Sequence, residues 1–228
     1  MNTPIVARTS PSPASLRTAR LGGICLALGG IAFFAGGVTH PGDSGGGTKV
    51  EQLYQALIQP TWYPSHALLL ASFGLFAAAI LLLRKRGNLG PGMARVVNVV
   101  SVVAVVATLG MAVHLLAALG AESIADGQPS LISEVQKWNE TILNTLWGLG
   151  IIALAAVGGL TRTLGNRITM PLGVVGGVAW CLAAATIAFI DLFDALFPVA
   201  GTLIPIWAVA AGVMWAVRAG SFPGQAAG

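Results

Sequence analysis

Six apolar stretches of 17 to 24 residues dominate the sequence and limit its fold more than any other feature. They cover residues 21–38, 67–83, 96–119, 142–160, 171–190 and 199–217. A helix needs about 20 mainly apolar residues to cross the hydrocarbon core of a bilayer, where it satisfies its own backbone hydrogen bonds. The sequence therefore predicts an all-α membrane protein, a polytopic bundle of six transmembrane helices.

The composition excludes a soluble domain. Of the 228 residues, 9% are charged and 55% are hydrophobic, and the mean hydropathy is +0.81. A soluble domain carries about 25% charged residues. The net charge of +4 comes without a basic face that bears interleaved aromatic side chains, so nucleic acid is not an expected partner. The segments between the apolar stretches are too short for a nucleotide-binding domain, which argues against an ATPase or a kinase.

The charged residues predict the orientation. Basic residues near the ends of membrane helices are retained on the cytoplasmic side. Ten of the twelve lie at the same ends of the apolar stretches: Arg8, Arg17, Arg20, Arg84, Lys85, Arg86, Arg95, Arg162, Arg167 and Arg218. We therefore expect an integral plasma (inner) membrane protein with both termini cytoplasmic. Residues 1–20 are expected to form a disordered cytoplasmic tail, residues 21–218 the transmembrane domain and residues 219–228 a short cytoplasmic tail.

Two of the extracytoplasmic connections are expected to contain short amphipathic helices on the outer surface. In the first, Thr48 and Glu51 have the spacing of a capping box, apolar residues follow at helical spacing, and Pro60 ends the run. In the second, an apolar stripe begins at Leu131 and continues into the fourth stretch.

Glycines form a strip along the first apolar stretch. They recur in pairs at seven-residue intervals: Gly22 and Gly23, Gly29 and Gly30, Gly36 and Gly37. Such a strip lets another backbone approach closely. It predicts packing against a helix of the same chain or, alternatively, contact with a second copy or with another membrane protein.

The histidines fall in one layer near the outer surface. At a rise of about 1.5 Å per residue, each lies about 27 to 30 Å beyond the basic end of its own stretch. The three are His40, His66 and His114, and Asn144 and Asp191 fall at the same depth. Polar side chains in membrane helices are costly and usually face the bundle interior, so this layer is a candidate functional site.

Imidazole and carboxylate groups together suit Zn, Cu, Fe or Ni, and three protein ligands with one open position are typical of catalytic zinc. His40, His66, His114 and Asp191 are therefore the candidate ligands of a transition metal. His66 and His114 are also candidate axial ligands of a b-type haem. No short metal-binding motif is present, so either site requires the helices to converge.

Two other functions remain open on the sequence alone. The protein could be a small-solute or ion transporter, or an accessory membrane protein whose polar layer only links helices by hydrogen bonds. Glu140 is expected to have no special role, because acidic residues are favourable at the beginning of a helix.

Overall fold

The computed structural model describes residues 13–42, 46–87, 89–128 and 130–218, and within these ranges every regular element is a helix. The long helices are α1 (Pro13–Val38), α3 (Trp62–Arg86), α4 (Pro91–Leu115), α7 (Thr145–Thr161), α8 (Met170–Thr186) and α9 (Leu196–Arg218). The shorter ones are α2 (Lys49–Leu57), the 3₁₀ helix η1 (Leu116–Gly120), α5 (Ala121–Ala125), α6 (Leu131–Trp138) and the π-helix η2 (Asn139–Asn144). The all-α prediction is confirmed.

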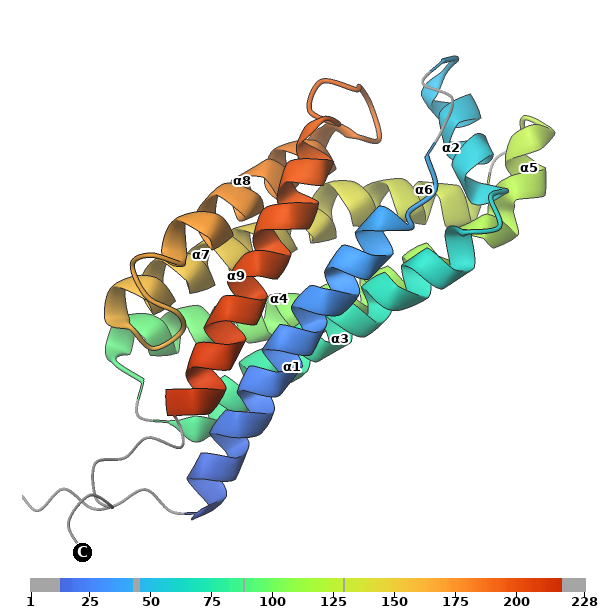
Figure 1. Cartoon of the computed structure of the whole chain (residues 1–228). Helices are drawn as coiled ribbons and strands as arrows, with labels where there is room; N and C mark the ends of the chain where they lie inside the picture. Colours follow the sequence, from blue (N-terminus) through green and yellow to red (C-terminus); the bar gives the residue numbers. More distant parts are fainter. Residues whose placement is uncertain (1–12, 43–45, 88, 129, 219–228) are drawn as a thin grey trace, which may run out of the picture.

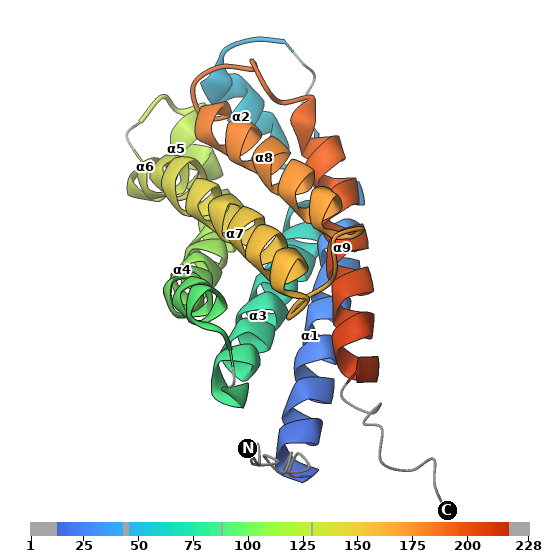
Figure 2. The same ribbon diagram turned by 90° about the vertical axis from the view of Figure 1, so that its left-hand side faces the viewer.

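The long helices form a closed ring in which each packs against two neighbours. α1 packs between α3 and α9, and the ring continues from α3 through α4, α7 and α8 back to α9. Figures 1 and 2 show that α1 begins and α9 ends at one end of the bundle, whereas α2, α5 and α6 gather at the opposite end. Inside the ring, Phe33 and Phe73 stack on Trp147 with ring centroids 5.3 and 4.6 Å apart. Aromatic side chains therefore fill its centre.

Within the part of the chain that the structure describes, five helical stretches are long and apolar enough to cross a membrane: Pro13–Val38, Trp62–Arg86, Pro91–Ala125, Leu131–Thr161 and Leu196–Arg218. The outside of the ring exposes large apolar side chains, among them Ile31, Val102 and Leu109. A surface of this kind suits lipid rather than water, where it would favour aggregation. These features support the prediction of a membrane helix bundle, while the number of six crossings stays a prediction.

Several predicted boundaries differ from the structure, and two of them change the expected length of a span or of the tail. The helix expected over residues 171–190 ends as α8 at Thr186, whose hydroxyl donates to the carbonyl of Leu182 at 3.0 Å, and turns follow. With 17 residues, α8 is at the lower limit for a membrane span. α1 begins at Pro13, so residues 13–20 of the expected cytoplasmic tail are helical. The remaining tail residues, 1–12 and 219–228, lie outside the described residues.

Both short helices expected between the apolar stretches are present. At α2, the Thr48 backbone N–H donates to the Glu51 carboxylate at 2.6 Å, and the Glu51 backbone N–H donates to the Thr48 hydroxyl at 3.3 Å. This reciprocal pair is the predicted capping box. α6 begins after Ser130, whose hydroxyl accepts from the Ser133 backbone N–H at 3.4 Å.

The glycine strip packs helices within the chain. A Cβ atom on Gly212 of α9 would lie 2.5 Å from the carbonyl oxygen of Gly23, and one on Gly30 would lie 2.9 Å from the Cβ of Ala208. Gly29 and Gly36 contact α3 in the same way. The strip is thus occupied by α9 and α3, so a partner could not dock on it without displacing one of these helices. At Gly37 the close approach ends, because a Cβ there would meet no described atom within 4 Å.

Gly212→Ala is expected to lower stability, because the added methyl group would press on the Gly23 backbone and α9 would have to shift. Overpacking of this kind costs about 1–3 kcal/mol. The measurement is the loss of helical circular dichroism on heating the detergent-solubilised protein. Gly74→Ala in α3 is the matched control: its Cβ would meet no described atom within 4 Å, and alanine favours the helix. Equal melting temperatures for the two variants would contradict the close α1–α9 contact.

Candidate functional site

The structure brings the three histidines together. His40 follows the end of α1, His66 lies in the second turn of α3, and His114 lies in the last turn of α4. Their ring centroids are 4.8 Å apart between His40 and His66 and 4.6 Å apart between His66 and His114. One ring nitrogen from each lies within 4.8 Å of the others, so the three side chains form one potential ligand group.

His66 is held in a single orientation. Its Nδ1 lies 2.7 Å from the carbonyl oxygen of Trp62 and 3.1 Å from the hydroxyl of Ser65. Because a carbonyl oxygen can only accept, Nδ1 carries the proton and Nε2 carries the lone pair. The ring is fully buried, and Nε2 has no hydrogen-bond partner among the described residues.

Trp62 joins α3 to the end of α4 beside the histidines. Its indole N–H donates to the carbonyl oxygen of Leu115 at 3.1 Å. Its ring stacks on His66 at a centroid distance of 3.8 Å and lies 5.4 Å from the ring of His114. Trp62 therefore fixes the relative position of two of the three histidines. The sequence gives no reason to group Trp62 with the histidines, because its side chain offers no metal-ligand atom.

The other two histidines differ in exposure. His40 is exposed, and its Nδ1 donates to the carbonyl oxygen of Pro41 at 3.0 Å, which leaves its Nε2 with the lone pair as in His66. His114 is 5% exposed, and its Nδ1 lies 3.7 Å from the carboxylate of Glu140. The group thus has one side open to solvent and one side buried.

Glu140 lies beside the histidine group, where the sequence did not place it. It lies in η2, a π-helical turn between α6 and α7, whereas the sequence predicted the ordinary beginning of a helix. A π-turn widens the helix by one residue and shifts the direction of the side chains that follow. Glu140 comes 74 residues after His66 and lies in an irregular turn, so no short spacing could have paired it with the histidines.

Two cavities share a wall at His40 and His114, whereas the buried His66 lines neither. An outer cavity of about 670 Å³ lies among α2, α6 and the α8–α9 connection, and its polar lining includes Lys49, Gln52, Ser130, Gln136 and Lys137. An inner cavity of about 560 Å³ has a mainly aromatic and aliphatic lining: Phe33, Leu69, Phe73, Met111, Trp180 and Phe197. His40, His114 and Glu140 line both cavities. A ligand at the histidines can therefore have a polar part on one side and an apolar part on the other.

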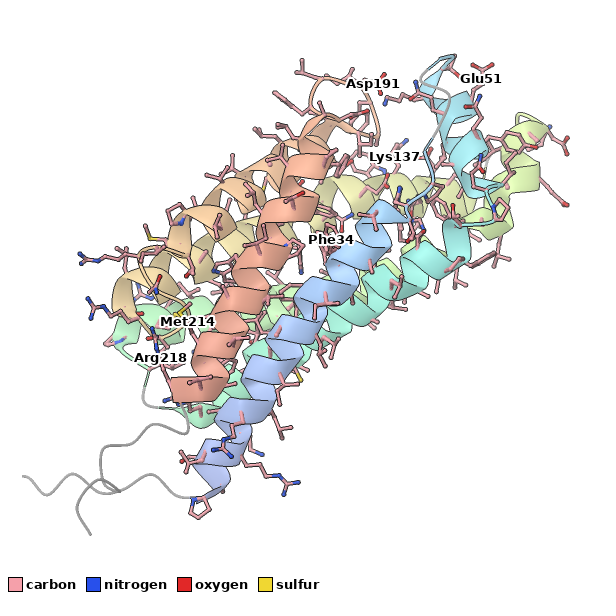
Figure 3. The ribbon with its side chains drawn as sticks, in the orientation of Figure 1. Phe34, Glu51, Lys137, Asp191, Met214 and Arg218 are labelled. Carbon is pink, nitrogen blue, oxygen red and sulfur yellow. The ribbon has the colours of Figure 1, made fainter. Side chains whose placement is uncertain are left out.

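The structure places Asp191 outside the histidine group. Its carboxylate pairs with the Lys49 ammonium at the beginning of α2, and Asp194 lies 3.6 Å from the same ammonium. Figure 3 shows Asp191 in the α8–α9 connection, facing α2. The hydrogen bond with Lys49 lowers the pKa of the Asp191 carboxyl, whereas partial burial raises the pKa of Asp194. These residues link α2 to the α8–α9 connection over the outer cavity.

Asp191→Asn is expected to loosen α2. In the variant, amide hydrogens of residues 49–57 should exchange faster at neutral pH. Because Asp191 has a lowered pKa when folded, the pair stabilises the protein above the ordinary aspartate pKa of about 3.9. The small difference in melting temperature between wild type and variant should disappear as the pH falls through the lowered pKa of Asp191. The difference should also shrink in high salt.

Glu134→Gln is the control for this prediction. Glu134 pairs with Lys137 within α6 at 2.7 Å, so its loss removes an exposed ion pair without separating two elements. Equal exchange rates of α2 in wild type and Asp191→Asn would show that the pair does not hold α2 in place.

No protein-family model, curated protein or solved structure matches this chain. The assignment of function therefore rests on the chemistry and geometry of the site itself.

Proposed function

We propose that His40, His66 and His114 hold one transition-metal ion, zinc in the first instance, and that the site uses it to activate water for hydrolysis. The observation that carries the proposal is the approach of three ligand nitrogens, from α3, α4 and the segment after α1, to within 4.8 Å of one another. In a tetrahedral site with metal–nitrogen distances of about 2.0–2.1 Å, two ligand nitrogens are about 3.3 Å apart. Because His66 is held by its hydrogen bonds, binding would require His40 and His114 to move toward its Nε2 by up to about 1.5 Å.

The hydrogen bonds of the rings support a metal rather than a purely structural role. Histidines that bind metals usually donate their second ring N–H to a carbonyl or a carboxylate, which fixes the tautomer and the direction of the ligand nitrogen. His66 and His40 both donate Nδ1–H to backbone carbonyls. The buried Nε2 of His66 has no partner among the described residues, and an unsatisfied group of this kind costs about 1–3 kcal/mol. A bound ion would satisfy it.

Three protein ligands leave one position for water or substrate, as in catalytic zinc sites. A zinc ion at such a site lowers the pKa of water to about 7. Glu140, beside His114 and on the wall of both cavities, is placed to accept the proton from this water and to return it to a leaving group. Asp191 is left out of the proposed ligand set, because Lys49 already pairs with its carboxylate.

Haem fits the cluster less well than a compact ion. Two axial imidazoles lie on opposite faces of a haem, so the macrocycle must pass between them. The rings of His66 and His114 instead pack against each other, with centroids 4.6 Å apart and planes inclined by 36°. This packing favours a small ion bound at the edges of the rings.

The proposal includes the expected topology: six crossings of the plasma membrane, with both termini cytoplasmic and the histidines on the outer side. Basic residues at the ends of α3 and α9, including Arg84 and Arg218, support this orientation. α8 would be the shortest crossing, with its outer end completed by the turns that follow Thr186.

The wild-type protein, purified in detergent without chelators, is expected to contain close to one metal ion per chain by elemental analysis. His66→Ala and His114→Ala should lose most of it, because each variant leaves only two imidazoles. The oxidised and reduced absorption spectra of the same samples should lack a Soret band. A reduction-sensitive Soret band would overturn the assignment of a compact ion in favour of haem.

Asp191→Asn is the matched control, since Asp191 lies at the same predicted depth but outside the histidine group. It should retain the metal at the wild-type level. If wild-type protein stays metal-free after incubation with zinc, or if His66→Ala and His114→Ala bind zinc as wild type does, the proposed site is wrong.

A further inference from the structure

The inner cavity opens on the outside of the ring, between the outer ends of α1 and α9. The residues of its rim are exposed: Phe34, Gly37 and Val38 on α1, Pro198 and Thr202 on α9. Gly37 and Gly201 both line the cavity, and a Cβ on either would meet no described atom within 4 Å. Figure 3 labels Phe34 at the level where the two helices diverge. The cavity therefore has an entrance on the face of the bundle.

This entrance lies at the depth of the acyl chains of the surrounding lipid. Gly37 is about 26 Å along α1 from Arg20, and Gly201 is about 26 Å along α9 from Arg218. The hydrocarbon core of a bilayer is about 30 Å thick. On the same scale the three histidines lie about 27 to 30 Å from the basic ends of their stretches, which places them at the outer edge of the hydrocarbon core. The opening thus faces hydrocarbon, and the histidines lie just beyond it, next to the membrane surface.

Both cavities expose more apolar than polar surface, but they differ in the polar side chains that they add to the shared ones. The inner cavity adds Asn144, Asp194 and Thr202 to an aromatic and aliphatic lining, whereas the outer cavity adds Lys49, Lys137 and several amide side chains to its apolar lining. His40, His114 and Glu140 lie on the boundary between them. The molecule that carries an apolar chain, a polar head and a bond between them at this depth is a membrane lipid.

We infer that the site takes a membrane lipid sideways from the outer leaflet, through the gap between α1 and α9. The acyl chain occupies the inner cavity, the headgroup occupies the outer cavity, and the linkage between them lies at the histidines. This inference rests on the proposed function for what happens to the linkage, but the binding of the lipid requires only the cavities and their entrance. A water-soluble substrate would need no opening toward hydrocarbon.

The test is photo-cross-linking in phosphatidylcholine vesicles that contain a phosphatidylcholine with a diazirine in its acyl chain. In the wild-type protein, mass spectrometry should locate adducts on the rim and lining of the inner cavity, including Phe34 and Phe197. Gly37→Leu and Gly201→Leu should lose most of these adducts, because the new side chains fill the entrance. Gly74→Leu, which adds the same side chain in open space on α3, should label as wild type does.

Adducts confined to the outer face of the ring, for example at Val102 and Leu109, would overturn the inference. So would equal labelling of the inner cavity in wild type and both entrance variants. If an entrance variant fails to fold, the position of the adducts in the wild-type protein alone decides between these outcomes. Elemental analysis of the same samples keeps the two proposals separate: metal without cavity adducts overturns only the lipid, and cavity adducts without metal overturn only the metal site.

Discussion

The hydrogen bond from the Trp62 indole to the Leu115 carbonyl determines the geometry of the histidine group. It joins the beginning of α3 to the end of α4, where the α-helix changes to a 3₁₀ turn and a backbone carbonyl becomes available. The same ring stacks on His66 and approaches His114. The contact adds to the packing of α3 on α4 and fixes His66 and His114 relative to each other. The site thus depends on a residue that offers no ligand atom.

Much of the fold followed from the sequence because the membrane imposes simple rules. The rise per residue and the position of the arginines were enough to place His40, His66 and His114 at one depth, and the structure brings these three together. The rise per residue gives the depth of a residue in the membrane, but it does not give the rotation of its helix around the helix axis. For that reason it grouped Asp191 with the histidines, although Asp191 lies in an irregular connection and pairs with Lys49.

Glu140 is the converse case, because the structure places it beside the histidines although no sequence pattern grouped it with them. Its position before an apolar stretch has an ordinary explanation, the favourable interaction of an acid with the beginning of a helix. The π-turn of η2 changes the direction of the residues in this segment, and such a turn depends on packing against α4 and α8 rather than on a local sequence signal. Residues in irregular helical turns were therefore the part of the site least accessible to sequence reasoning.

The glycine strip of α1 has a consequence for the permeability of the membrane. Near the basic end, α1 and α9 touch backbone to backbone at Gly23 and Gly212, and the stacked rings of Phe33, Phe73 and Trp147 fill the ring of helices. The space around the histidines is therefore closed toward the basic ends of α1 and α9. With the orientation and the lipid access proposed above, the site would exchange molecules with the outer leaflet, while the aromatic layer beneath it would block a path for protons and ions. Chemistry at the site would then not dissipate the gradients across the bilayer.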